Sequence, residues 1–409
     1  MINTQVAIIG GGLAGLICAI NCQQLGIDYL IIEKESTVGG KQQTSLINNY
    51  NCDHGFQVLL SAYPIAQKYL NYNKLNLVPF KKNALCWDGK KFIGFANPLT
   101  ALFSIINPFT SAPFKLTDYV TLATIAATIK FKTKENIFSL PNQQTQEYFN
   151  KTNLSTTFKT LFLEPFFKGI FLDPKLETSV RLFYFYLQCF INGITAIPKQ
   201  GIQAIPQQLA SHIPSKKILY DNKVVSIKNS IVETDNQRRI KADYICCAAD
   251  LYQASKLFNF PTPKSHSVYN LYVEAPEPVI KNNIIYLDGL SNGPINNFHN
   301  ANIKNKTTQL LSFSALPTSP NEPLYEKEIL LHAKTYFGQQ ITKWNIVKFF
   351  QIKHALPQQK TSFNMLNTHY NHQNIFFCGD WTLQGSIQGA MQSGELIAKK
   401  IYDQLCTNS

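Results

Sequence analysis

The feature that most constrains the fold is a glycine-rich turn near the N-terminus. Residues 6–9 form a short apolar run typical of a buried parallel strand, and Gly10-Gly-Gly-Leu-Ala-Gly15 follows directly. Residues 16–25 then have helical periodicity. In such a unit Gly10 makes the tight turn, Gly12 lets a pyrophosphate approach the backbone, and Gly15 permits close packing of helix on strand. The pattern predicts a dinucleotide whose phosphates lie at the helix N-terminus.

The second strand narrows the choice of dinucleotide. Residues 29–32 are apolar, and Glu33 follows them about 20 residues beyond the turn, where the dinucleotide-binding pattern has an acid. A carboxylate here accepts hydrogen bonds from the ribose hydroxyls and disfavours a 2′-phosphate. The sequence therefore predicts FAD or NAD and not NADP, with a glycine-rich turn that binds no ligand as the alternative.

A glycine pair after this strand gives the sequence a resemblance to a known family. Gly39-Gly-Lys41 resembles the Gly-Gly-Arg segment of the FAD-dependent amine oxidase superfamily, which includes phytoene desaturases and protoporphyrinogen oxidases. The resemblance implies that Gly39 and Gly40 support the pyrophosphate and ribityl chain of FAD. Lys41 departs from the family's arginine, because lysine keeps the charge but lacks the planar donor fork.

The segment after the glycine pair is similar to an aspartate-x-glycine stretch of the desaturase-like members. It reads Cys52-Asp-His-Gly-Phe-Gln-Val-Leu-Leu60. The resemblance implies that Gly55, Phe56 and Gln57 line the flavin side of a cleft. A plain turn into a strand is the alternative.

The C-terminal end supplies the other half of the predicted cofactor site. Residues 374–378 read as a buried strand, Gly379-Asp380 ends it, and residues 385–394 open an amphipathic helix that runs to residue 401. This arrangement resembles the superfamily's terminal FAD motif. The resemblance implies that Asp380 approaches the ribityl chain and that the helix N-terminus, with Ile387, Gln388, Gly389 and Ala390, points at the pyrimidine end of the flavin.

A third matching piece lies between the two ends. Residues 197–206 resemble the segment that leads back into the FAD domain, and strands are expected at 223–228, 230–234 and 240–250. The resemblance implies that the backbone of Val224 contacts the adenine. Small side chains at Ala248 and Ala249 would let the cofactor approach the strand end, although core packing alone would also select alanine.

The predicted cofactor is FAD, bound non-covalently because Cys378 lies inside a strand. No metal site, H-E-x-x-H, G-x-S-x-G or Walker loop is present in the sequence, so metalloprotease, serine hydrolase and nucleotide-triphosphatase functions have no support, and no catalytic side chain is singled out. The predicted cofactor-binding residues are Gly10, Gly12, Leu13, Ala14, Gly15, Glu33, Lys34, Gly39, Gly40, Lys41, Gly55, Phe56, Gln57, Val224, Ala248, Gly379, Asp380, Ile387, Gln388 and Ala390.

The predicted fold class is α/β. A Rossmann-type domain for FAD or NAD(P), made of residues 1–60, 197–259 and 358–409, holds an inserted α+β substrate domain, 61–196 and 260–357, as in the amine oxidase and GDI-like architecture. Helices are expected at 64–70, 116–131 and 155–167, and strands at 266–274 and 310–316.

Three features of the substrate region have competing interpretations. The aromatic run of residues 183–186, together with Phe190, suits an apolar cavity or an ordinary core. Arg181 could hold a substrate carboxylate or a structural glutamate. The turn expected at 353–357 resembles a segment close to the flavin, which would bring Lys353 or His354 near N5, with a solvated lysine and a satisfied histidine as the alternative.

The predicted function is an FAD-dependent oxidoreductase that moves a hydride from a C–H bond of a lipophilic, polyene- or isoprenoid-like small molecule to flavin N5, with reoxidation by oxygen or a quinone. An amine oxidase of the same superfamily is one alternative. A non-catalytic GDI-like module that binds lipid or protein is another.

Charge and cysteine content bear on partners and compartment. The net charge is +13, but the lysines are scattered and form no stripe, so nucleic acid is not expected; contact with a membrane surface stays an alternative. Nine cysteines without paired spacing indicate a reducing compartment, and we expect a cytoplasmic protein. Polar residues interrupt the longest apolar stretch, residues 182–198, so a membrane span is not expected; the oligomeric state is left open.

Overall fold

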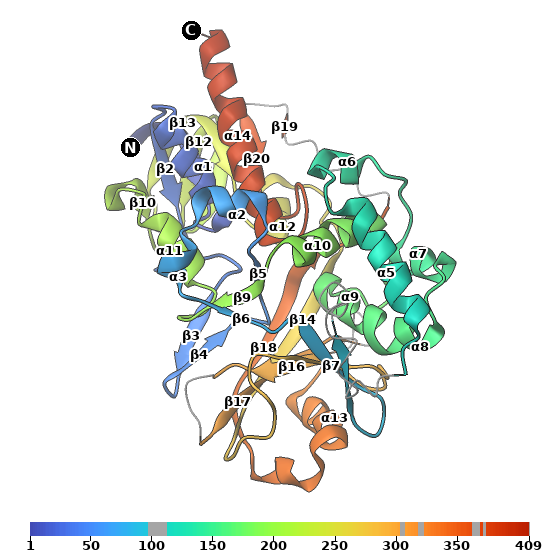
Figure 1. Ribbon diagram of the computed structural model, residues 1–409. Coiled ribbons are helices and arrows are strands. Elements are labelled where there is room, and N and C mark those ends of the chain that lie inside the picture. The colour runs from blue at the N-terminus through green and yellow to red at the C-terminus, as the bar shows by residue number, and fades with distance from the viewer. Residues whose placement is uncertain (97–112, 303–306, 318–322, 362–368, 371–373, 409) are drawn as a thin grey trace.

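Two β-sheets organise the chain, with a group of helices beside them (Figure 1). The computed structural model describes residues 1–409 except 97–112, 303–306, 318–322, 362–368, 371–373 and 409. The expected α/β class is confirmed. The expected division into two discontinuous domains stays a prediction.

The first sheet is built around the N-terminal strand. Its order is β10 (Ile218–Leu219), β2 (Tyr29–Ile32), β1 (Ile2–Ile9), β13 (Arg239–Cys247), β12 (Ile231–Thr234) and β11 (Val224–Lys228). β20 (Ile375–Phe377) also pairs with β13, and β19 (His369–Tyr370) pairs with β20. The central strands β2, β1, β13 and β20 run parallel, so their carboxyl ends meet at one edge of the sheet.

Alternate side chains of these strands enter two different cores. Ile8, Ile31 and Cys246 lie in the core with helices α1 (Leu13–Gln24) and α14 (Ile387–Asn408). Ile9 and Cys247 lie in the core on the other face, with α12 (Leu251–Phe258). The two ends of the chain therefore share one side of the sheet, where α1 and α14 pack on each other (Figure 1).

The second sheet is mostly antiparallel. Its order is β18 (Asn345–Pro357), β14 (Ser265–Ala275), β17 (Gln309–Ala315), β16 (Ile295–Asn300), β15 (Ile285–Asp288), β7 (Asn83–Trp87) and β8 (Phe92–Ala96). Helix α13 (Glu326–Phe337) and a 3₁₀ turn, Gly338–Lys343, share a hydrophobic core with one face. The strands expected at 266–274 and 310–316 correspond to β14 and β17. The turn expected at 353–357 is wrong, because these residues form the end of β18, which pairs with β14.

The helices of the insertion have an aromatic core. The largest fully buried side chains here are Phe149, Phe158, Phe167, Phe183 and Phe185. The elements are α5 (Leu116–Ile129), α6 (Lys134–Phe138), α7 (Thr145–Lys151), α8 (Thr156–Phe158), a π-helical turn (Lys159–Leu163), α9 (Glu164–Phe171) and α10 (Val180–Asn192). The helix expected at 116–131 corresponds to α5, and the one expected at 155–167 is divided among α8, the π-helical turn and α9.

Short elements connect the two sheets. β5 (Leu59–Leu60), β9 (Thr195–Pro198) and β6 (Leu77–Pro79) form a small sheet, and β3 (Thr44–Ile47) and β4 (Tyr50–Asp53) form a hairpin. The remaining elements are α2 (Pro64–Tyr69), α3 (Tyr72–Leu75), α11 (Ala204–Ala210) and a 3₁₀ turn (Ser215–Lys217). Within the described ranges, no helix combines the length and the apolar character needed to cross a membrane.

Candidate cofactor and substrate site

A cavity of about 1100 Å³ lies where the carboxyl edge of the parallel sheet meets the second sheet and the helices. Its walls include residues that follow β1, β2, β13 and β20, namely Gly10, Glu33, Ala248 and Gly379. We call this part of the wall the cofactor edge. Segments that are hundreds of residues apart thus face the same space.

The glycine-rich turn has the close packing expected of a phosphate cradle. Gly10 has φ +106°, and its N–H donates to Ile32 O at 2.9 Å. A Cβ on Gly15 would lie 2.0 Å from Gly10 O, which explains why helix and strand need glycine here. Gly12 begins α1 without a side-chain cap and lines the cavity, as do Leu13 and Ala14, so the helix N-terminus is available to an anion.

The acid after β2 lies at the same edge. Glu33 is buried; its Oε2 accepts the Gly11 N–H at 2.5 Å and its Oε1 accepts the Glu35 N–H at 2.9 Å. Burial raises the pKa of Glu33 from its ordinary value. Glu33 lines the cavity beside the turn, and Lys34 also lines it. This placement suits an acceptor for ribose hydroxyls.

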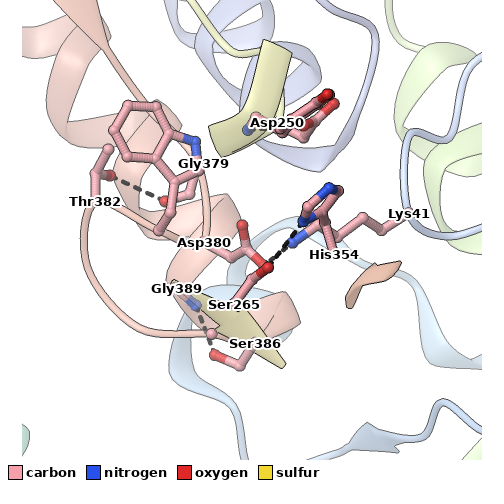
Figure 2. Close-up of polar contacts among 12 residues, drawn as sticks. Lys41, Asp250, Ser265, His354, Gly379, Asp380, Thr382, Ser386 and Gly389 are labelled. Atoms are coloured by element: carbon pink, nitrogen blue, oxygen red, sulfur yellow. Dashed lines mark hydrogen bonds and ion pairs between the residues drawn. The ribbon is translucent and has the colours of Figure 1, made fainter. Parts of the chain in front are cut away.

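An ion pair joins the two halves of the site. Lys41 Nζ lies 2.6 Å from Asp380 Oδ2, and Figure 2 shows the two side chains pointing toward each other. Both line the cavity, and the Asp380 side chain is 11% exposed. Gly379, next to it, donates its N–H to Ser393 Oγ at 2.8 Å, and its carbonyl accepts Thr382 Oγ1 at 2.9 Å (Figure 2). Lys41 therefore places a positive charge beside Asp380 at the cofactor edge.

One of the free N–H groups at the start of α14 is already bonded to a side chain of the same segment. Ser386 Oγ accepts the Gly389 N–H at 3.0 Å (Figure 2). Ile387 and Ala390 line the cavity, whereas Gln388 does not. Gln388 Oε1 instead accepts the Ile65 N–H at 3.1 Å, which ties α14 to α2.

The other predicted cofactor residues also have defined places. Gly40, Gly55, Phe56, Gln57, Val224 and Ala248 line the cavity, as does Ala249. Gln57 Nε2 donates to Lys41 O at 2.7 Å. Gly15 and Gly39 do not line it; the Gly39 N–H donates to Gly11 O at 3.0 Å, which holds the glycine pair beside the turn.

Several polar side chains lie together at the cavity wall, and the sequence analysis anticipated only some of them. Lys353 and His354 both line the cavity. His354 stacks on Tyr252, with ring centroids 4.6 Å apart, and its Nδ1 lies 2.8 Å from Ser265 Oγ (Figure 2). The sequence analysis missed Tyr252, because the residue that it stacks on, His354, lies about 100 residues further along the chain on β18. Arg181 is not a lining residue; its Nε donates to Leu140 O at 2.6 Å, and among the described residues it pairs with no glutamate.

Beyond the cofactor edge lies a second part of the wall, which we call the chamber; the sequence analysis anticipated Tyr186 and Phe190 in it but missed its other residues. It is formed by side chains of α5, the π-helical turn, α9 and α10. The strands β15 and β16 add Ile285, Leu287 and Asn297. The helix residues of the chamber are Leu122, Ala126, Phe162, Leu163, Phe166, Phe167, Ile170, Tyr186, Leu187, Phe190 and Ile191.

The residues present fit FAD. The cradle of glycines, the uncapped start of α1, the buried acid and the Lys41–Asp380 pair are the groups that a pyrophosphate, ribose and ribityl chain require. In the described part of the chain, no cluster of three or more His, Cys, Asp or Glu side chains could hold a metal ion. The fold and the groups at this site are those of a dinucleotide-binding protein.

Comparison with known proteins identifies the family. The model of the flavin-containing amine oxidoreductases matches residues 13–402, so the chain belongs to this family and is an FAD-dependent oxidoreductase. A curated Drosophila melanogaster protein, "Possible lysine-specific histone demethylase 1", is 33% identical over 89 residues, which are 21% of this chain and 10% of that protein. The chain thus matches only a small part of that relative's length.

Solved structures share the fold over almost the whole chain. An oxidoreductase from Methanosarcina mazei has a TM-score of 0.75 at 13% identity, covering 97% of this chain and 100% of that one. Cyclohexylamine oxidase from Brevibacterium oxydans IH-35A has a TM-score of 0.71 at 16% identity, covering 98% and 99%. At these identities the likeness concerns the fold.

Proposed function

We propose that this flavoenzyme oxidises a lipophilic small molecule, removing a hydride from a C–H bond, with oxygen or a quinone as the final electron acceptor. The predicted cofactor-binding residues are part of the same proposal. The observation that carries it is the contrast between the charged cofactor edge and the apolar chamber.

The carboxylates of the cavity wall all belong to the cofactor edge. Among the described lining residues they are Glu33, Glu35, Asp250 and Asp380. The chamber adds phenylalanine, leucine, isoleucine and alanine side chains, and Tyr186, whose hydroxyl donates to Gly385 O at 3.2 Å. The lining lysines Lys81 and Lys82 are exposed. A diamine would need buried acids for its ammonium groups, whereas an apolar molecule gains by covering these aromatic surfaces.

The protein's part in this reaction is binding and electrostatics. When bound, FAD supplies the hydride-accepting chemistry. Phe162, Phe166 and Phe190 would hold the substrate body and exclude water. Lys41 and Asp380 fix the cofactor edge, and Lys353 and His354 place positive charge or a hydrogen-bond donor at the cavity wall.

An absorption spectrum followed by anaerobic titration tests the proposal. Flavin bleaching by polyenes or isoprenoids, with recovery on admission of air, supports it. Bleaching by amines alone identifies an amine oxidase instead. Acid precipitation tests the non-covalent binding, because flavin retained on the denatured chain contradicts it.

The outer face of α5 supports membrane contact as a route for such a substrate. Leu116 and Val120 are exposed, while Leu122 and Ala126, on another face of the helix, line the cavity. Lys115 and Lys130 flank the helix. Sedimentation with anionic vesicles tests this, and Val120→Glu should reduce binding if α5 is the contact.

A further inference from the structure

A second hollow adjoins the cavity at the surface of the protein. It has a volume of about 1020 Å³, and its walls come from residues 61–82 and 191–199. Lys82, Ile191 and Gly193 line both the hollow and the cavity. Lys81 lines the cavity as well, and both lysines are exposed. We call these four residues the mouth, because the cavity and the hollow meet at them.

The mouth carries positive charge with no acid beside it. Residues 54–87 and 178–220, which include its walls, contain no Asp or Glu. No acidic side chain of the described chain lines the hollow, whereas Lys199 adds a further ammonium group to it. Neither Lys81 nor Lys82 forms an ion pair with a described residue. The charge of the mouth therefore attracts anions and repels cations.

The mouth lies directly beside the apolar wall of the chamber. Phe190 lines the cavity, and Ile191, the next residue of α10, lines both the cavity and the hollow. An anionic group carried into the chamber would lose its hydration and meet mainly apolar side chains. At the mouth the same group stays in contact with water and gains two ammonium neighbours. The chamber and the mouth therefore suit opposite ends of one molecule.

We infer that the substrate is an amphiphile whose apolar body occupies the chamber and whose anionic head, a carboxylate or phosphate group, stays at the mouth beside Lys81 and Lys82. This rests on the function proposed above and narrows its substrate class from lipophilic molecules in general to anionic ones. The apolar body enters first, so the C–H bond that is oxidised lies in the part of the molecule away from the head. Lys81 and Lys82 are thus specificity-determining residues.

Probes that share one apolar body test the inference. Farnesoic acid carries a carboxylate at neutral pH, and methyl farnesoate is its uncharged ester. Perturbation of the flavin spectrum of the FAD-loaded protein under anaerobic conditions gives each dissociation constant. At low ionic strength we expect the acid to bind about fivefold more tightly than the ester, because exposed ion pairs contribute modestly. The ratio should fall toward one in about 1 M salt, where exposed charges are screened.

Two double variants separate the mouth from the overall charge of the protein. Lys81→Met with Lys82→Met should bring the ratio to about one and leave the affinity for the ester unchanged. Lys90→Met with Lys91→Met is the matched control, because these adjacent lysines are also exposed but line neither the cavity nor the hollow. The control removes the same charge, so the ratio should persist.

Three results overturn the inference. They are equal binding of the two probes by the unaltered protein, a ratio that survives in the Lys81 and Lys82 double variant, and an equal loss of the ratio in both double variants. The ratio in the unaltered protein and its dependence on salt require no variant. Flavin bleaching by either probe reports on the proposed function separately, because it does not depend on the ratio.

Discussion

At the cofactor edge the cavity wall consists largely of glycine, backbone and a few charges, whereas in the chamber it consists of phenylalanine and leucine side chains. At the edge, a Cβ on Gly10 would lie 3.1 Å from Ala248 O, so the backbone leaves no choice of residue. In the chamber, Phe166 and Phe190 pack with centroids 5.3 Å apart and are only half-buried. Each position of the cofactor edge therefore requires a particular residue, whereas the chamber requires only a total side-chain volume and an apolar character.

Gly15→Ala should give the largest effect. Its Cβ would lie 2.0 Å from Gly10 O, a backbone atom that cannot move aside, so we expect the free energy of unfolding to fall by about 3 kcal/mol or more. Chemical denaturation measures this.

Gly12→Ala is its counterpart, because the nearest atom to the new Cβ is Gly40 Cα at 3.7 Å. The apoprotein should keep its stability while FAD affinity falls at least about tenfold, since the methyl group occupies the approach of the pyrophosphate. Unchanged FAD affinity would contradict the phosphate cradle.

Asp53 tests the region just behind the edge. It is buried and accepts bonds from Thr44 Oγ1 at 2.6 Å and the Ile202 N–H at 3.0 Å, yet burial raises its pKa to about 6. The folded protein therefore holds this proton more tightly than the unfolded chain does. The contribution of the protonated Asp53 carboxyl to the free energy of unfolding is complete below about pH 4 and is lost as pH rises to about 6.

Asp53→Asn should remove that dependence. Between pH 4 and 6 the unaltered protein should lose roughly 2–3 kcal/mol relative to the variant, measured as the difference between the two stability curves. Parallel curves would show that Asp53 has the same pKa in the folded and unfolded states, which would contradict the prediction.

Lys41→Met addresses the pair that joins the two halves of the site. The substitution leaves Asp380 as an unpaired, mostly buried carboxylate, so we expect a loss of about 2 kcal/mol and weaker FAD retention. Lys360→Met is the control, because its pair with Glu177 is more exposed and should cost about 0–1 kcal/mol. Equal losses in both variants would mean that the Lys41 pair has no special role.

These differences explain what could be predicted from the sequence. The turn, Glu33 and Gly379-Asp380 were found because each requirement is local: a conformation, a strand end or a helix start. Asn297 was not found, because its position depends on β16 pairing with β15 and β17. The residues 353–357 were mistaken for a turn because Pro357 signals a break, whereas pairing with β14 keeps β18 extended. Pairing between strands that are far apart in the sequence thus determines the sheet wall of the chamber. Such pairing cannot be recognised from a single sequence.

Phe190→Leu should lower the free energy of unfolding only modestly, by about 1 kcal/mol, because the ring is half-buried and its loss enlarges a space that is already open. FAD content should stay the same while affinity for an isoprenoid probe such as geraniol changes, since Phe190 lines the chamber and not the cofactor edge. Phe185→Leu is the control: that ring is fully buried but does not line the cavity, so stability should fall further and ligand affinity should hold. Flavin content and probe titration of both variants measure the contrast. If Phe190→Leu loses flavin, the cofactor edge and the chamber act as one site, because a side chain that faces the substrate would then also hold the cofactor.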